Sequence, residues 1–250
     1  MRHQRRLLGT LVLALGPVAA TGCAGGSGSG VLHVLETQPP SGPVPAGDLY
    51  PMRAGQWIYD VDGGNQIVLE RSRTDRFGAT WMTREGDQRT EFWHLDDDGN
   101  IVLDATIDHQ HSAISIFEPP LVIAYRELAP RQPRRDETAM RVVDLNNPEI
   151  QREFGTAVRT IEYINDERIR TPTGEFLVKH IEVRFVADLQ MANAVTDLTL
   201  YVVPALGVVA EQRRESVKFF GIGVPKSRTL TLATAPSEAT AQVPGRGAAK

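Results

Sequence analysis

The sequence predicts an all-β, mainly antiparallel fold: a single curved sheet or half-barrel with few short helices, preceded by a signal peptide and a flexible tether. Three observations lead to this prediction. Short runs alternate apolar and polar residues with the period of two that a half-buried strand requires. Turn-forming Asp, Gly, Asn and Pro residues separate these runs at short intervals. Helical periodicity is scarce, which argues against a parallel α/β sheet.

The first strands form hairpins. Trp57, Tyr59 and Val61 share one face of a strand, and a turn over residues 62–65 leads into a strand over 67–69. The Asp-Gly-Gly-Asn sequence of this turn suits a hairpin, because positive φ angles cost little there. The other predicted strands of the first half cover residues 77–82, 92–95 and 101–103.

The clearest strand covers residues 176–187. On it, Ile181, Val183, Phe185 and Ala187 face one side, while the residues between them face the other. The other predicted strands of the second half cover residues 140–143, 157–164, 168–171, 198–203, 208–213 and 229–232, and turns are expected at 171–174 and 204–207. Residues 188–195 form either two helical turns or a loop.

The chain divides into four expected segments. Residues 1–22 read as a lipoprotein signal peptide, with a basic start, an apolar run and small residues before the cut. Residues 23–47 are expected to be an acylated Cys followed by a flexible tether rich in Gly, Ser and Pro. Residues 48–233 form the antiparallel β domain. Residues 234–250 have few large apolar side chains and are expected to be a disordered tail.

Cys23 is the only cysteine of the chain, and it follows Ala-Thr-Gly at residues 20–22. This arrangement resembles the lipobox of bacterial lipoproteins, which implies lipidation of Cys23 and attachment of palmitate-type chains. Membrane lipid is therefore the first expected partner, because two or more chains give stable anchoring. Ala24, rather than Asp, follows the cysteine, which favours the periplasmic face of the outer membrane over the inner membrane.

The N-terminus has two other interpretations. An ordinary secretory signal would leave Cys23 as a free thiol. A transmembrane anchor is disfavoured, because the apolar run over residues 7–15 is shorter than the roughly 20 residues that span a bilayer. Removal of the signal takes away three arginines and no acidic residue, so the formal charge changes from −4 to −7. This acidity argues against a nucleic-acid partner.

Three short segments resemble a group of bacterial hypothetical lipoproteins with a β-rich envelope domain. Tyr50-Pro51 with residues 55–59 is similar to a Y-P…G…W-x-Y opening, residues 171–176 to a T-P-x-G-x-F turn, and residues 204–209 to an apolar-Pro-x-x-G-x-V hairpin. The resemblance implies a curved antiparallel sheet like the half-barrel of the LolA/LolB/LppX carriers, whose concave face holds acyl chains. It implies no catalytic or ligand-binding residues.

No metal or cofactor is expected. His109 and His111 share one strand face and His94 lies upstream, but a zinc site needs three or four ligands at tetrahedral angles. The acidic run over residues 96–100 does not fit an EF-hand, because isoleucine occupies the glycine and the final glutamate positions of that loop. A hairpin turn explains this run better.

No catalytic residues are predicted. The serines considered as nucleophiles have no G-x-S-x-G context, and they are Ser41, Ser72, Ser112, Ser115, Ser216 and Ser227. Members of a catalytic triad are neighbours in space rather than in sequence, so a hydrolase stays open as the minor alternative. The chain is therefore expected not to be an enzyme.

Two hypotheses for the function follow. In the first, a membrane-anchored, non-enzymatic envelope lipoprotein binds an apolar ligand or lipid on its curved β-sheet. In the second, a structural or assembly lipoprotein presents a β surface to an envelope protein. Residues 118–125 bear on this choice, since this apolar stretch with two prolines is either a loop packed on the open side of the sheet or a lid over an apolar cavity.

Overall fold

The computed structural model describes residues 32–219, 223 and 225–236. The expected signal peptide, Cys23 and most of the expected tail lie outside these residues. Within them, only α1 (Ala46–Leu49) and the 3-10 turn η1 (Arg76–Gly78) are helical. Neither of these described helices is long and apolar enough to cross a membrane. The strands are β1 (His33–Gln38), β2 (Val44–Pro45), β3 (Gly55–Val61), β4 (Asn65–Arg73), β5 (Trp81–Glu85), β6 (Arg89–Leu95), β7 (Ile101–Asp108), β8 (Ala113–Ala124), β9 (Glu127–Leu128), β10 (Arg134–Asp144), β11 (Gln151–Thr171), β12 (Gly174–Leu189), β13 (Ala192–Val203), β14 (Gly207–Phe219) and β15 (Pro225–Thr234).

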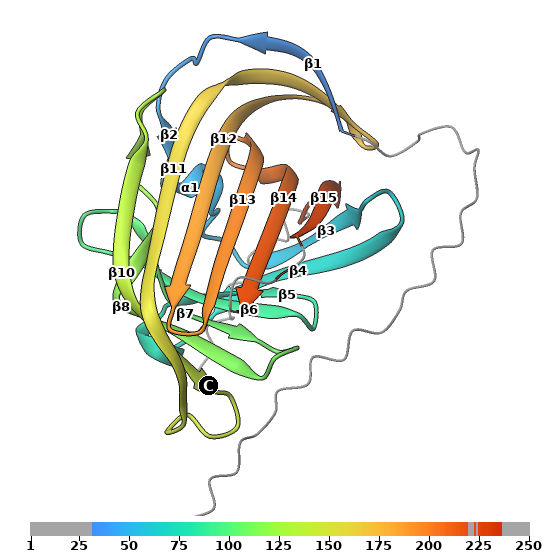
Figure 1. Cartoon of the computed structure of the whole chain (residues 1–250). Helices are drawn as coiled ribbons and strands as arrows, with labels where there is room; N and C mark the ends of the chain where they lie inside the picture. The colour runs from blue at the N-terminus through green and yellow to red at the C-terminus, as the bar shows by residue number, and fades with distance from the viewer. Residues whose placement is uncertain (1–31, 220–222, 224, 237–250) are drawn as a thin grey trace, which may run out of the picture.

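The main sheet closes on itself as a barrel (Figure 1). Twelve antiparallel strands follow one another in the order β11-β10-β8-β7-β6-β5-β4-β3-β15-β14-β13-β12, and β12 pairs back with β11. The prediction of an all-β, antiparallel fold is confirmed, but the expected open sheet or half-barrel is wrong. Local alternation of apolar and polar residues specifies strands, whereas closure depends on which distant strands meet, here β3 with β15.

β11 is the longest strand of the barrel and pairs along both of its edges. This strand has 21 residues and pairs with β12 over positions 155–171. Along its other edge it pairs with β10 over residues 151–161 and with β1 over residues 166–170. Both edges of β11 are therefore hydrogen-bonded over most of its length, and the ring leaves few exposed sheet edges.

Most of the predicted hairpins form. The turns expected near residues 62–65, 96–100, 171–174 and 204–207 connect antiparallel pairs of strands. Residues 188–195 form no helix, since β12 and β13 continue through most of them. The strand expected over residues 77–82 begins only at Trp81, because η1 occupies its first part.

The proline-containing stretch over residues 118–125 is neither a loop nor a lid. It belongs largely to β8, a strand between β7 and β10. Leu103 pairs with Leu121 and Ala105 with Ile116, so the β7 register skips the residues around Pro119 and Pro120. The two prolines thus lie at an irregularity where no hydrogen bond to β7 is required of them.

The N-terminal part of the described chain contributes to the fold. Residues 32–47, which the sequence assigns to the tether, contain β1, β2 and the start of α1. β2 pairs with β9, and Val44, Ala46 and Leu49 are buried in the main apolar core. The packed part of the chain therefore begins before residue 48.

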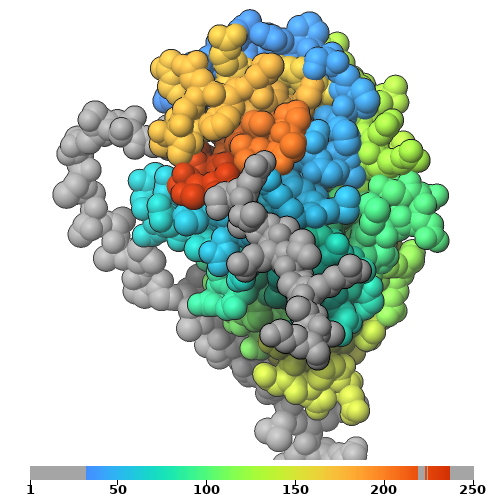
Figure 2. Space-filling model, turned by 180° about the vertical axis from the view of Figure 1, so that it is seen from behind, coloured from blue at the N-terminus to red at the C-terminus, as the bar shows by residue number. Residues whose placement is uncertain are grey.

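Buried apolar side chains form three clusters. The largest combines β2 and α1 with side chains from β5 to β13, including the fully buried Trp93, Tyr163 and Ile161. A second cluster joins Ile169 and Val178, near the tip of the β11–β12 hairpin, to Tyr201 and neighbouring residues. In Figure 1 this hairpin arches over the top of the barrel, and in Figure 2 its tip lies beside the red strand β15. A third cluster lies around Phe92 and Ile107.

Gly155 lies at the tightest point of the β11–β12 seam, the pairing of these two strands over positions 155–171. A Cβ at this position would lie 1.9 Å from the carbonyl oxygen of Asp188 on β12. The contact is with backbone, so no side-chain rotation relieves it. We expect Gly155→Ala to lower the free energy of unfolding by about 1–3 kcal/mol, measured by urea denaturation. Gly64→Ala is the control, since the nearest atom to its Cβ would be 4.0 Å away. Equal midpoints for the two variants would contradict this seam geometry.

Candidate ligand site inside the barrel

A half-open cavity of about 190 Å3 lies inside the barrel. Its wall combines apolar side chains with charged ones, which is unusual for the interior of a strand barrel. The apolar lining includes Trp57, Leu103, Phe117, Leu121, Ile123, Phe185, Leu198 and Leu200. The charged lining consists of Arg71, Arg89, Arg159, Arg213, Glu85, Glu91 and Glu211. Leu49, Tyr50 and Pro51, from α1 and the segment after it, complete the wall.

The carboxylates of this wall are paired. The Arg213 side chain contacts Glu211 at 2.7 Å, and Glu85 contacts Arg228 at 2.5 Å. Arg89 contacts Glu91 at 2.8 Å. Burial alone would raise the pKa of Glu85, but nearby arginines, above all Arg213 and Arg228, hold it below its usual value. Each cavity carboxylate therefore has its own guanidinium.

Arg71 has no carboxylate partner among the described residues but is satisfied by neutral groups. Its Nη1 donates to the carbonyl oxygen of Pro51 at 2.6 Å, and its Nε donates to Thr83 Oγ1 at 3.3 Å. Its guanidinium carbon lies 4.9 Å from the ring centre of Trp57 and 5.4 Å from that of Trp93. Burial lowers the pKa of Arg71 to about 10, so the side chain stays charged at neutral pH.

Arg159 is the least satisfied charge of the site. The residue is only 8% exposed, and its Nε and Nη2 are buried without a hydrogen-bond partner among the described residues. Asp136 is its cross-strand neighbour on β10, but that carboxylate accepts the backbone N–H of Val122 at 2.8 Å. A buried charge without a hydrogen-bonded counterpart is costly. Of the charged side chains in the cavity wall, Arg159 would therefore be stabilised most by a ligand that accepts its hydrogen bonds.

Aromatic side chains support the same region. Trp93 stacks on Trp81 with ring centres 5.7 Å apart and meets the ring of Tyr50 edge-on at 5.9 Å. Burial raises the pKa of Tyr50, and the positive charge of Arg159 partly opposes this rise. The Tyr50 hydroxyl consequently stays protonated at neutral pH, where it is a hydrogen-bond donor close to Arg159.

Among the serines considered as nucleophiles, Ser41 is the one whose hydroxyl contacts a lysine in the described part of the chain. Lys179 Nζ lies 2.6 Å from Ser41 Oγ, 3.0 Å from Tyr163 Oη and 2.9 Å from Asp166 Oδ1. Burial would lower the pKa of Lys179, but its bonds to Tyr163 and Asp166 raise it. A protonated ammonium cannot accept the proton of the Ser41 hydroxyl, so this arrangement is a poor nucleophile–base pair. It instead fastens the chain between β1 and β2 to the barrel.

The histidines considered as metal ligands do not come together. His94 Nδ1 contacts Asp104 Oδ2 at 2.8 Å, His109 Nε2 contacts Thr90 Oγ1 at 2.9 Å, and His111 contacts Asp108 at 2.7 Å. Across residues 32–219, 223 and 225–236, no three His, Cys, Asp or Glu residues form a group that could hold a metal ion. The acidic run after β6 makes the expected turn, in which Asn100 N donates to Asp96 Oδ1 at 2.7 Å.

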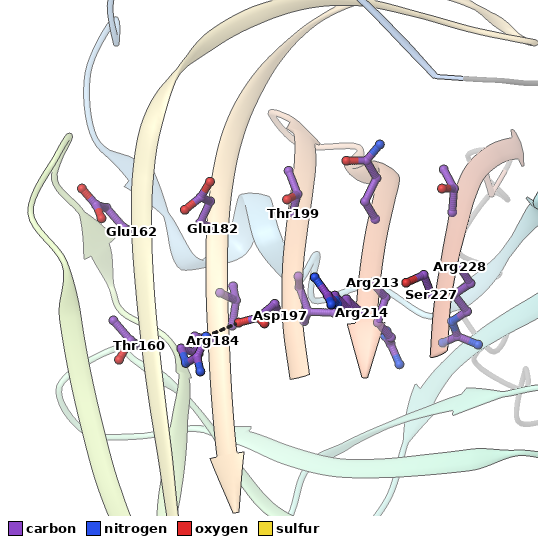
Figure 3. A pocket seen from close by; sticks show the side chains of 14 residues that line it. Thr160, Glu162, Glu182, Arg184, Asp197, Thr199, Arg213, Arg214, Ser227 and Arg228 are labelled. Carbon is purple, nitrogen blue, oxygen red and sulfur yellow. Dashed lines mark hydrogen bonds and ion pairs between the residues drawn. The ribbon is translucent and has the colours of Figure 1, made fainter. Parts of the chain in front are cut away.

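A second hollow lies on the outer face of β11 to β15 (Figure 3). It has a volume of about 580 Å3, and most of the residues that line it are polar or charged. Two cross-strand rows form it, and they are Glu162-Glu182-Thr199-Gln212-Thr229 and Thr160-Arg184-Asp197-Arg214-Ser227. Arg184 contacts Asp197 at 2.9 Å. This outer groove is shallow and open, whereas the inner cavity is partly enclosed.

The sequence contains a signal for the inner site that a search for known motifs misses. Arg159 shares a strand face with Ile161 and Tyr163, and both of these are fully buried. Arg213 likewise lies opposite Leu198 on β13. A charged residue in register with buried apolar residues indicates a polar site within a core. The sequence does not reveal that side chains from distant strands converge on this interior cavity.

The fold and the site define the chain as a closed antiparallel barrel with a small, charged and partly apolar interior cavity. No protein-family model matches the chain, and no curated protein matches it. Among solved structures, it is similar to the crystal structure of the hypothetical lipoprotein YmcC from Escherichia coli (K12). The two share 13% identity and a TM-score of 0.40, over 74% of this chain and 88% of that one. The grouping with the LolA/LolB/LppX carriers stays a prediction.

Proposed function

We propose that this protein is a non-enzymatic, lipid-anchored envelope protein that binds a small ligand inside its barrel. The observation that carries the proposal is the half-open interior cavity, whose wall joins apolar side chains to Arg159, with Nε and Nη2 that find no partner among the described residues. Binding sites for small molecules typically combine an apolar lining with a few convergent polar groups. The anchor is the lipidated Cys23, and the favoured location is the periplasmic face of the outer membrane.

The size of the cavity narrows the class of ligand. Its volume of about 190 Å3 is below the roughly 300–1,000 Å3 of pockets that enclose drug-sized ligands. A small molecule fits this space better than a complete lipid acyl chain. A compact ligand in a closed barrel is therefore proposed in place of a lipid on an open curved sheet.

A protein partner on the outer groove is the second candidate function. The observation that favours it is the pair of polar rows across β11 to β15, which leaves a hollow of about 580 Å3 on the outer surface. In this case the barrel serves as a rigid support, and the envelope protein that it meets binds outside it.

Two neighbouring residues on β13 separate the candidates. Leu198 lines the inner cavity and Thr199 lies in the outer polar row. We expect the exported chain with Cys23→Ser to carry a bound small molecule, detected by native mass spectrometry and by mass spectrometry of its extract. Leu198→Trp should fill the cavity and abolish this binding, whereas Thr199→Trp should leave it unchanged.

Each result has a defined meaning, provided that circular dichroism melts show both variants folded. An empty unaltered protein, or a ligand retained by Leu198→Trp, would contradict binding in the barrel. Loss of crosslinks to an envelope protein in Thr199→Trp alone would support the partner on the outer groove.

A further inference from the structure

We propose that the interior cavity is a seat for the carboxylate of a small organic anion, with Arg159 as its principal contact. This inference rests on the proposed function and adds the chemical class of the ligand. It starts from the two Arg159 nitrogens that lack a partner within the described chain although the residue is 8% exposed. Buried polar groups are nearly always hydrogen-bonded, so such an exception indicates a missing partner.

The balance of charge favours an anion. Four arginines and three glutamates line the cavity. The glutamates are paired with Arg89, Arg213 and Arg228, so none of them compensates Arg159. Within the part of the chain that the structure describes, Arg71 bonds only to neutral acceptors, and it adds positive charge to the same wall. A ligand carboxylate would relieve this excess, and a guanidinium can bind it through two parallel hydrogen bonds.

The remaining wall indicates an organic rather than an inorganic anion. Phe185 is the cross-strand neighbour of Arg159 on β12, and Leu198, Phe117 and Leu121 continue the lining. These side chains would cover the apolar part of a ligand whose carboxylate lies on Arg159. The small volume limits that apolar part to a short chain or a single ring.

Tyr50 gives the seat a second donor. Its hydroxyl stays protonated because burial raises its pKa, and Arg159 is the strongest of the positive charges that oppose this rise. Tyr50 and Arg159 line the same cavity, so a carboxylate at Arg159 would share that cavity with a neutral phenol. This arrangement would favour a carboxylate over the corresponding uncharged amide.

The test compares hexanoate with hexanamide by isothermal titration calorimetry on the exported chain carrying Cys23→Ser. We expect hexanoate to bind at least about tenfold more tightly than hexanamide, the cost of losing a hydrogen bond to a charged group. Arg159→Met should weaken hexanoate binding by at least a similar factor and leave hexanamide binding unchanged. Arg184→Met, which removes an exposed arginine from the adjacent strand, is the matched control and should bind hexanoate normally.

The outcomes distinguish this inference from the proposed function. Equal binding of both probes, or hexanoate binding that Arg159→Met does not weaken, would overturn the carboxylate seat while leaving a ligand site in the barrel. Binding of inorganic phosphate in preference to hexanoate would overturn the organic class. Binding of neither probe would overturn the inference, while a molecule recovered in the extract of the unaltered chain would still uphold the proposed function. If Arg159→Met does not fold, the comparison of hexanoate with hexanamide on the protein with unaltered Arg159 still tests the preference for a carboxylate.

Discussion

Replacement of Trp93 by alanine is expected to lower the free energy of unfolding by about 3–5 kcal/mol, the usual range for a buried large aromatic residue. Trp93 has no exposed surface, and its Nε1 donates to Thr83 Oγ1 at 3.0 Å. Its ring also packs on Trp81 and Tyr50. The variant loses this burial and leaves a new cavity in the core. Equilibrium urea denaturation followed by circular dichroism measures the change.

Two variants of the same strand complete this experiment. Trp93→Phe keeps a ring but loses the indole donor and part of the side-chain volume. Its free energy of unfolding should therefore lie between that of Trp93→Ala and that of the unaltered protein. Leu95→Ala truncates a side chain of a residue that is 46% exposed, and it should change stability by less than 1 kcal/mol, roughly as surface substitutions do. A loss for Trp93→Ala no greater than that for Leu95→Ala would contradict its place in the core.

The strands were predictable because local patterns specify them. Ile181, Val183 and Ala187 were expected to share one face of a strand, and all three are buried in the main cluster. The turns also formed where expected, and Asp62, Gly63 and Gly99 adopt the positive φ angles that such turns require locally. Local patterns act within a few residues, which is why this part of the fold was accessible.

Closure and the site were not predictable for the opposite reason. The ring closes where β3 pairs with β15, and these strands lie at opposite ends of the described chain. The candidate site gathers Arg71, Arg159 and Arg213 from three strands that are remote in sequence. No local sequence pattern specifies contacts between strands that are so far apart in the chain. The same limit applies to Ser41, whose contact with Lys179 spans 138 residues.

Lys179→Met is expected to destabilise the protein by about 3–5 kcal/mol at neutral pH, because it leaves a buried carboxylate without its cation. The Lys179 and Asp166 side chains are 13% and 6% exposed, and their closest atoms lie 2.9 Å apart. Asp166 also accepts a hydrogen bond from the hydroxyl of Tyr163. Methionine keeps the length of the aliphatic stem, so the loss of stability measures chiefly the loss of the ammonium.

The pH dependence identifies this cause. Burial would raise the pKa of Asp166, but its hydrogen bonds with Tyr163, Ser41 and Lys179 lower it overall. The stability that Asp166 contributes is thus complete above the ordinary Asp pKa of about 3.9, and it is lost as the pH falls through the lower pKa of the folded state. The raised pKa of Lys179 contributes stability that is complete below about 10.4 and lost as the pH rises further.

The difference between unaltered and Lys179→Met protein should therefore be largest between about pH 4 and pH 10, and it should shrink in acid, where Asp166 becomes neutral in both. Asp166→Asn combined with Lys179→Met should recover part of the loss, because no buried charge is left unpaired. The exposed pair of Arg184 and Asp197 is the control, and Arg184→Met should cost less than about 1 kcal/mol. A loss for Lys179→Met that is independent of pH down to pH 3 would show that packing, not the ion pair, fastens the segment around Ser41 to the barrel.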